Sequence, residues 1–194
     1  MLKTWIVILL HQLIFQGMFV TKNIFLHRKI GKKIRGHNIE ATISILFFAF
    51  FIGTAIVISL IQQPIGKIQL LNDDFTMTLG LGLLALNLII SATSLVGLKD
   101  SWRVGVLEDQ KTELVVTGIY RFTRNPYFLS YALMFAAHTI ILQNLLLVFL
   151  SICGFCLVHY MVLKEEKYLL SIHKDTYVRY KNKVPRYLIK RVIS

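Results

Sequence analysis

The chain has 194 residues, of which 55% are hydrophobic, and a formal net charge of +12 at pH 7. Its mean hydropathy of +0.61 excludes an ordinary soluble domain, in which about 45–50% of residues are apolar. High hydropathy combined with many basic residues is typical of a membrane protein with basic cytosolic segments, and it disfavours a nucleic-acid binder. The two cysteines provide no disulfide framework, and the length indicates one domain.

Five apolar runs follow one another along the chain, over residues 2–20, 41–61, 75–98, 127–142 and 145–163. A spanning helix needs about 17–25 apolar residues, which the second and third runs supply. The first run contains His11, Gln12 and Gln16, and we interpret it as a span because no small-residue cleavage site follows it. Only Gln143 and Asn144 separate the short fourth run from the fifth. We therefore expect a tight helical hairpin there, and whether the fourth run crosses fully stays open.

The basic residues alternate between the connections. Twenty of the 22 lysines and arginines fall in residues 21–40, in residues 99–127 or after residue 163. Because cytosolic loops carry the excess of Lys and Arg, five spans would place the N-terminus outside and the C-terminus in the cytosol. We thus predict an all-α integral membrane protein with about five transmembrane helices.

The tail after the last apolar run has a helical pattern. Leu170, His173, Tyr177, Tyr180 and Val184 recur at intervals of three and four residues, which places them on one face of a helix. A basic amphipathic helix of this kind lies on anionic headgroups or packs over a pocket, and the pattern fits both arrangements.

The sequence GIYRFTRNPYF, residues 118–128, stands at the start of the fourth run. Asn is a good N-cap and proline suits the first turn, so we expect a helix that begins at Pro126 and is capped by Asn125. The free N–H groups of such a helix end attract an anion, and the nearby tyrosine rings attract a cation. Arginine and tyrosine at a helix end are also what a plain membrane interface shows, so the cluster by itself leaves both interpretations open.

Two adjacent carboxylates, Glu165 and Glu166, follow the fifth run directly. They are either a solvated pair neutralised by Lys164 and Lys167 or a site for a ligand's amine or hydroxyls. A helical hairpin would bring them close to residues 120–128. A pocket there would suit a zwitterionic ligand that resembles an amino acid.

The segments LVVTGIYRFTRNPYFLS, EEKYLL and YVRYKNKVPRY resemble, in this order, the isoprenylcysteine carboxyl methyltransferase family, which is related to the membrane phospholipid methyltransferases. The resemblance covers about residues 100–187. It implies S-adenosylmethionine as the cofactor, with S-adenosylhomocysteine as the product. The cofactor-binding positions that it implies are Thr112, Glu113, Leu114, Val115, Tyr120, Asn125, Pro126, Tyr127, Phe128 and Glu165, and the implied catalytic residues are Arg124, Glu165 and Glu166.

The resemblance divides the chain into three N-terminal transmembrane helices, residues 1–98, and a catalytic half, residues 99–194. This half would hold a cytosolic segment, the hairpin 126–163 and the amphipathic tail, with the cofactor pocket on the cytosolic side. Asn125 stands where many members have His, and Met161 stands where the prenylcysteine enzymes have an arginine that meets the substrate.

The primary interpretation is methylation of the carboxylate of a C-terminal isoprenylated cysteine, or of a similar lipophilic substrate, by an enzyme embedded in the lipid bilayer. A carboxylate is already ionised at pH 7 and needs no general base. The lipid tail would reach the pocket from the bilayer and the soluble cofactor from the cytosol, beneath a tail helix over residues 167–184. The alternatives are a phospholipid or lipid N-methyltransferase and a non-catalytic lipid-binding membrane protein or transporter. We expect no nucleic acid and no metal as partners.

Overall fold

The computed structural model describes residues 3–31, 39–61, 64–103 and 113–188. These residues form the long helices α1 (Thr4–Ile30), α2 (Ile39–Leu60), α3 (Asp73–Gly97), α4 (Pro126–Leu142) and α5 (Leu145–Lys183). Two short 3₁₀ turns, Lys99–Ser101 and Gly118–Arg121, lie between α3 and α4. Within the described ranges the fold is all-α, as the sequence predicts.

Four of these helices, α1, α2, α3 and α5, are long and apolar enough to cross a membrane, and α4 is a shorter apolar helix of 17 residues. The protein is therefore an all-α integral membrane protein. The boundaries of α1 differ from the prediction, because the helix continues to Ile30 through part of the segment assigned to a basic loop. It ends where Gly31 adopts a φ of 67° and its N–H bonds to the carbonyl of His27, the usual left-handed helix stop.

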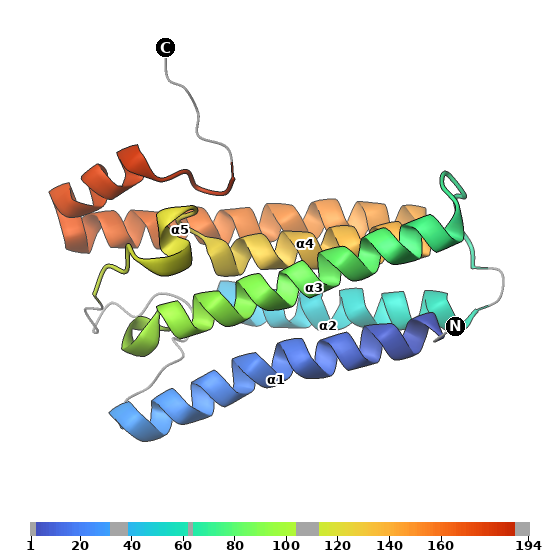
Figure 1. The fold of residues 1–194 in the computed structure, drawn as a ribbon, viewed down its shortest axis with the longest axis horizontal. Coiled ribbons are helices and arrows are strands. Elements are labelled where there is room, and N and C mark those ends of the chain that lie inside the picture. The colour runs from blue at the N-terminus through green and yellow to red at the C-terminus, as the bar shows by residue number, and fades with distance from the viewer. Residues whose placement is uncertain (1–2, 32–38, 62–63, 104–112, 189–194) are drawn as a thin grey trace, which may run out of the picture.

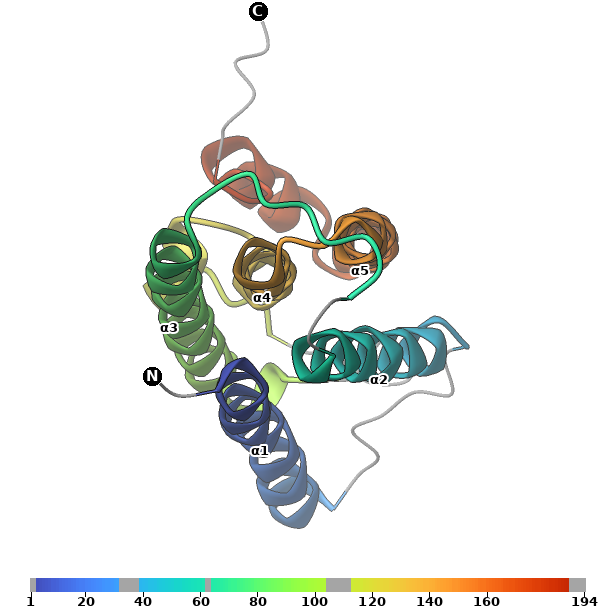
Figure 2. The same ribbon diagram turned by 90° about the vertical axis from the view of Figure 1, so that its right-hand side faces the viewer.

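Helix α4 lies at the centre of the bundle, with α3, α1, α2 and α5 around it (Figure 2). Its buried side chains accordingly point to several sides and include Tyr127, Met134, Phe135 and Ile141. A helix that is apolar all round is one that is buried all round. This central position explains why α4 is apolar on all sides.

Polar side chains join α1, α3 and α4 inside the bundle. The ring Nε2 of His11 lies 2.9 Å from Oδ1 of Asn87, whose amide donates to the carbonyl of Ser130 at 2.7 Å. The hydroxyl of Ser91 donates to that of Ser130 at 2.8 Å. Asn87 and Ser130 are buried, so these bonds fix the register of the three helices where water cannot compete.

The tight hairpin between α4 and α5 is confirmed. Gln143 adopts a φ of 42° at the end of α4, and the side chain of Asn144 accepts from the N–H of Leu146 to cap α5. The Gln143 amide also accepts from the N–H groups of Leu70 and Leu71. The connection that precedes α3 is therefore packed on the hairpin turn, at the end of the bundle where the N-terminus lies (Figure 1).

At the opposite end of the bundle α5 does not continue straight. The helix has a break at Lys174, with φ 44° and ψ −123°, and its last turns fold back towards the bundle (Figure 1). The prediction of one continuous tail helix over residues 167–184 is therefore wrong, because Leu170 and Tyr177 lie on different sides of the break. Leu170 is exposed, whereas Tyr177, Tyr180 and Val184 form a buried cluster.

Candidate functional site

A cavity of about 190 Å³ opens among α2, α4, α5 and the segment that connects α3 to α4. Its apolar part is formed by side chains of the bundle such as Phe48, Phe128 and Val158. Charged and polar side chains, among them Glu113 and Glu165, line the remainder. The cavity is thus suited to a ligand that has both an apolar part and a polar part.

Nearly all the site residues predicted from the sequence line this cavity. They are Glu113, Leu114, Val115, Tyr120, Arg124, Asn125, Pro126, Tyr127, Phe128 and Glu165. Thr112 lies outside the described residues. Glu166 does not line the cavity. In the part of the chain that the structure describes, no group of three or more His, Cys, Asp or Glu side chains is placed to hold a metal ion.

Glu166 is instead the centre of a buried ionic cluster. Its Oε1 lies 2.9 Å from a guanidinium nitrogen of Arg124, and its Oε2 lies 2.8 Å from one of Arg186. The Asn125 amide also donates to Oε1 at 3.1 Å. The Arg124 and Glu166 side chains are only 7% and 8% exposed. Buried charges are tolerated only when they are paired and hydrogen-bonded, so Glu166 needs all of these partners. Since they come from the start of α4 and from the C-terminal segment, Glu166 holds these two parts together.

The segment after the break, residues 175–187, forms a strap over the cavity. Arg124 donates to the carbonyl of Val184 at 2.6 Å, and its own N–H donates to the carbonyl of Pro185 at 2.9 Å. The hydroxyl of Tyr180 donates to the carbonyl of Tyr120 at 2.7 Å. Tyr180 also lines the cavity, so the strap is part of the cavity wall.

The N-cap prediction at Asn125 is half correct. The helix begins at Pro126 as expected, but the Asn125 side chain makes no capping bond. Its amide donates to Glu166 and to the carbonyl of Arg186 instead. Among the described residues no acceptor contacts the N–H groups of Tyr127 and Phe128. Unbonded first-turn N–H groups with the positive end of the helix dipole behind them favour an anion.

Glu165 differs sharply from its neighbour. Its side chain lines the cavity, and no residue of the described ranges forms a hydrogen bond or an ion pair with its carboxylate, whereas three side chains bind Glu166. Burial and the adjacent charge of Glu166 raise the pKa of the Glu165 carboxyl to about 7. Burial also raises the pKa of the Tyr120 phenol, which stays neutral. The site thus contains one half-buried carboxyl group that pairs with no cation of the described residues, and an opposite charge on a ligand would favour its ionised form.

The structure also shows residues to which the sequence assigned no role. Arg186 pairs with Glu166, and this contact raises the pKa of its guanidinium. Arg186 belongs to the closing VPRY sequence of the resemblance, and this was the signal from which a role for it could have been predicted. Trp102 lines the cavity, and its indole N–H donates to Oδ1 of Asn23 at 2.8 Å.

Met161, which the resemblance to the prenylcysteine enzymes aligns with a substrate-binding arginine, also lines the cavity. Its sulfur accepts from the hydroxyl of Ser44 at 2.8 Å. His159 lies 3.0 Å from the hydroxyl of Tyr187 and does not line the cavity. The histidine therefore does not take the place of the missing cation.

The fold and the cavity define an integral membrane protein with a mainly apolar binding cavity that also contains charged side chains, at one end of a helical bundle. The model of the phospholipid methyltransferase family matches residues 75–176, more than half of the chain, and the chain belongs to this family. It is accordingly a membrane methyltransferase that acts on lipid-like substrates. No curated protein matches the sequence.

Proposed function

We propose that the protein uses S-adenosylmethionine to methylate the carboxylate of an isoprenylated cysteine or of a similar lipophilic acid. The observation that carries this proposal is the unpaired Glu165 carboxylate, which shares one cavity with the start of α4 and with an apolar wall of bundle helices. The polar part suits the amino-acid end of the cofactor, and the apolar part suits a lipid tail.

The residues present fit this cofactor. Glu165 is placed to accept hydrogen bonds from an ammonium or from hydroxyls, and the N–H groups of Tyr127 and Phe128 are placed to bind a carboxylate. The rings of Trp102 and Tyr120 line the same cavity and offer faces that attract a cation such as a sulfonium. When bound, S-adenosylmethionine supplies an electrophilic methyl group on a positively charged sulfur.

The chain's own contribution to the reaction is positional. A carboxylate acceptor is ionised at neutral pH, since its reference pKa is about 4, and therefore no residue has to remove a proton from it. The walls of the cavity hold the two reactants close and exclude water, which can supply most of the required rate enhancement. In this proposal Glu165 binds, while Arg124 and Glu166 position α4 and the strap without touching the reacting atoms.

The basic residues support a cytosolic position for the cavity. The ends of α1, α3 and α5 nearest the cavity lie at one end of the bundle (Figure 1) and carry or adjoin most of the lysines and arginines. By the positive-inside rule this end faces the cytosol, with the N-terminus outside.

The test is methyl transfer by the purified protein in detergent with isotopically labelled S-adenosylmethionine. The acceptors are an N-acetylated farnesylcysteine, its carboxamide and phosphatidylethanolamine. We expect label only in the farnesylcysteine acid, in a form that dilute alkali releases as methanol, because a methyl ester is base-labile and an N-methyl group is not. Alkali-stable label in phosphatidylethanolamine would make the protein a lipid N-methyltransferase. If S-adenosylhomocysteine fails to bind a folded sample, the proposed cofactor is wrong.

A further inference from the structure

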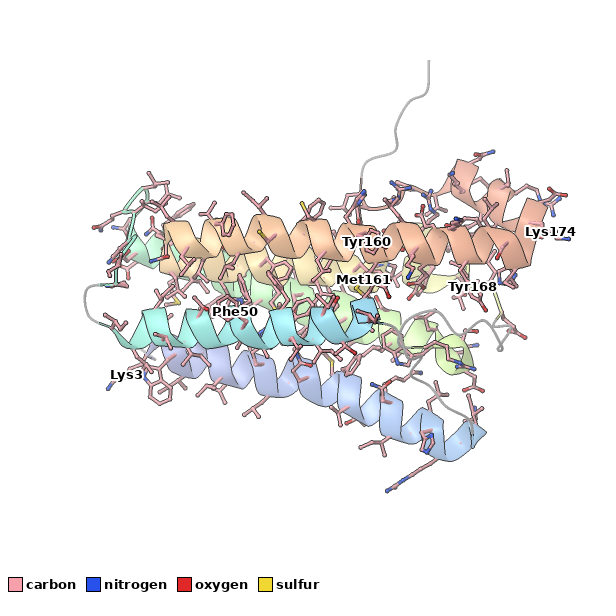
Figure 3. The ribbon with its side chains drawn as sticks, turned by 180° about the vertical axis from the view of Figure 1, so that it is seen from behind. Lys3, Phe50, Tyr160, Met161, Tyr168 and Lys174 are labelled. Carbon is pink, nitrogen blue, oxygen red and sulfur yellow. The ribbon has the colours of Figure 1, made fainter. Side chains whose placement is uncertain are left out.

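Two helices, α2 and α5, lie side by side along one wall of the cavity and contact each other at successive turns. Glu40 pairs with Lys164 at the rim, and one turn deeper the Ser44 hydroxyl donates to the Met161 sulfur at 2.8 Å. Figure 3 shows Met161 directed from α5 towards α2. Below this level Phe48 and Val158 belong to one apolar cluster. The seam between α2 and α5 is therefore ionic at its rim and apolar below it.

All six of these residues line the cavity. A lipid with one acidic headgroup and one apolar tail has the same order of polarity as this seam. A tail lying against Phe48 and Val158 would place its headgroup near Ser44 and Met161, and neither of those side chains carries a charge. The first cation along the seam is Lys164, three residues after Met161 on the same face of α5.

The other cations that line the cavity within the described ranges are Arg103 and Arg124. Arg124 is held by the Glu166 carboxylate and by the carbonyls of Lys181 and Val184. The guanidinium of Arg103 donates to the carbonyls of Asp100 and Trp102, each at 2.7 Å. Both arginines are thus engaged by fixed groups of their surroundings, and neither lies on the seam.

The ion pair between Lys164 and Glu40 is of a different kind. Glu40 is itself a carboxylate, and the Lys164 and Glu40 side chains are 49% and 26% exposed. A solvent-accessible ion pair contributes little to stability, so a second carboxylate can replace Glu40 at small cost. The ammonium of lysine is also a mobile point charge on a flexible stem, able to follow a new partner.

We infer that Lys164 binds the acidic headgroup of the lipid acceptor, and that Glu40 occupies Lys164 until this headgroup replaces it. The inference rests on the proposed function and names the residue that selects the acceptor class. Lys164 supplies the charge that Met161 does not, one turn nearer the rim, while the tail of the acceptor lies along the apolar part of the seam. Lys164 thereby acts on acceptor affinity and not on the cofactor.

Two substitutions with opposite expected signs test this inference. Lys164→Gln removes the cation and should raise the KM for the farnesylcysteine acid about tenfold to a hundredfold, the loss expected for a hydrogen bond to a charged group. Glu40→Gln removes the competing carboxylate and should lower that KM. Lys164→Arg keeps the charge and should stay much closer to wild type than Lys164→Gln. The Kd for S-adenosylhomocysteine, measured on the same samples, should stay constant.

The uncharged farnesylcysteine carboxamide, used as a competitive inhibitor, separates recognition of charge from packing. Its Ki should be nearly the same in wild type and Lys164→Gln, because it carries the tail without the carboxylate. Equal changes in the KM for the acid and the Ki for the amide would overturn the inference in favour of a packing role. An unchanged KM in Lys164→Gln would also overturn it. Failure of the wild type to bind S-adenosylhomocysteine would instead defeat the proposed function itself.

Discussion

Arg124 and Glu166 form a buried ion pair, 2.9 Å apart, between the start of α4 and the middle of α5. The same arginine donates to the carbonyl of Val184, and the same glutamate pairs with Arg186. The two residues thus connect three segments that are far apart in the sequence. Any movement of the strap away from the cavity has to break contacts with this pair.

The first prediction concerns the stability of this cluster. Removing one partner of a buried ion pair leaves the other charge uncompensated and costs about 3–5 kcal/mol. Glu166→Gln should therefore lower the Tm of the detergent-solubilised protein clearly and should speed proteolytic cleavage within residues 175–187. Lys167→Gln is the control, because this neighbouring lysine is exposed and does not line the cavity. Equal Tm values for Glu166→Gln and the control would contradict the role given to the cluster.

The second prediction concerns the contact between the strap and the cavity wall. Tyr180→Phe deletes the hydrogen bond to the carbonyl of Tyr120, worth about 1 kcal/mol. If strap closure and ligand binding are linked, the Kd for S-adenosylhomocysteine should rise by up to about fivefold, which calorimetry can resolve. Tyr160→Phe removes the hydroxyl of an exposed tyrosine on α5 and should leave the Kd unchanged. A Tyr180→Phe variant with wild-type affinity would show that the strap contact does not affect binding.

The third prediction compares two glycines on α3. A Cβ at Gly80 would collide with the Ile141 side chain and lie 3.3 Å from the carbonyl of Ala137, whereas one at Gly82 would meet nothing within 4 Å. Gly80→Ala should therefore destabilise the α3–α4 contact by about 1–3 kcal/mol. Gly82→Ala should be neutral or stabilise the helix by about 0.5–1 kcal/mol. Thermal unfolding of the pair decides this, and similar Tm values would mean that α3 and α4 do not pack as described.

The fourth prediction concerns pH. An acceptor carboxylate with a pKa of about 4 is fully ionised from about pH 6 to 8. With saturating cofactor and acceptor, kcat should be nearly flat over this range, because no proton has to leave the acceptor. An amine acceptor must first lose its proton, so its methylation should accelerate as the pH rises. A steep increase of kcat with pH would argue against the carboxylate as the acceptor.

Local patterns were sufficient to predict the hairpin and the start of α4. Asn-Pro before an apolar run fixes a helix start through backbone sterics alone, and two polar residues between apolar runs leave room only for a turn. The side chain of Asn125 was mispredicted for a physical reason. Glu166, 41 residues further along, offers the Asn125 side-chain amide a charged acceptor. A hydrogen bond to a charged group is stronger than a neutral capping bond.

The division between Glu165 and Glu166 was outside the reach of the sequence. Adjacent residues on a helix point in directions about 100° apart, so one carboxylate had to face the cavity and the other the strap. Which one does so depends on how α5 is rotated against α4. Composition around the pair, with Lys164 and Lys167 on either side, gave no preference.

The break at Lys174 also depends on tertiary contacts. Leu170, His173 and Tyr177 keep a helical spacing through it, so no periodicity marks the break. The strap folds back because Tyr177, Tyr180 and Val184 are buried against the bundle, and the positive φ at Lys174 is a consequence. The end of α1 differs, since Gly31 after a basic last turn was a readable stop signal that the charge of the segment obscured.

The most direct test of the account is calorimetry of S-adenosylhomocysteine with the wild type and with Glu165→Gln, using Lys167→Gln as the control. We expect binding to the wild type and the control, and an affinity at least about tenfold weaker for Glu165→Gln with an unchanged Tm. An unchanged affinity in Glu165→Gln would contradict the role of the unpaired carboxylate. Absence of binding to a folded wild-type sample would contradict the assignment of the cavity to this cofactor.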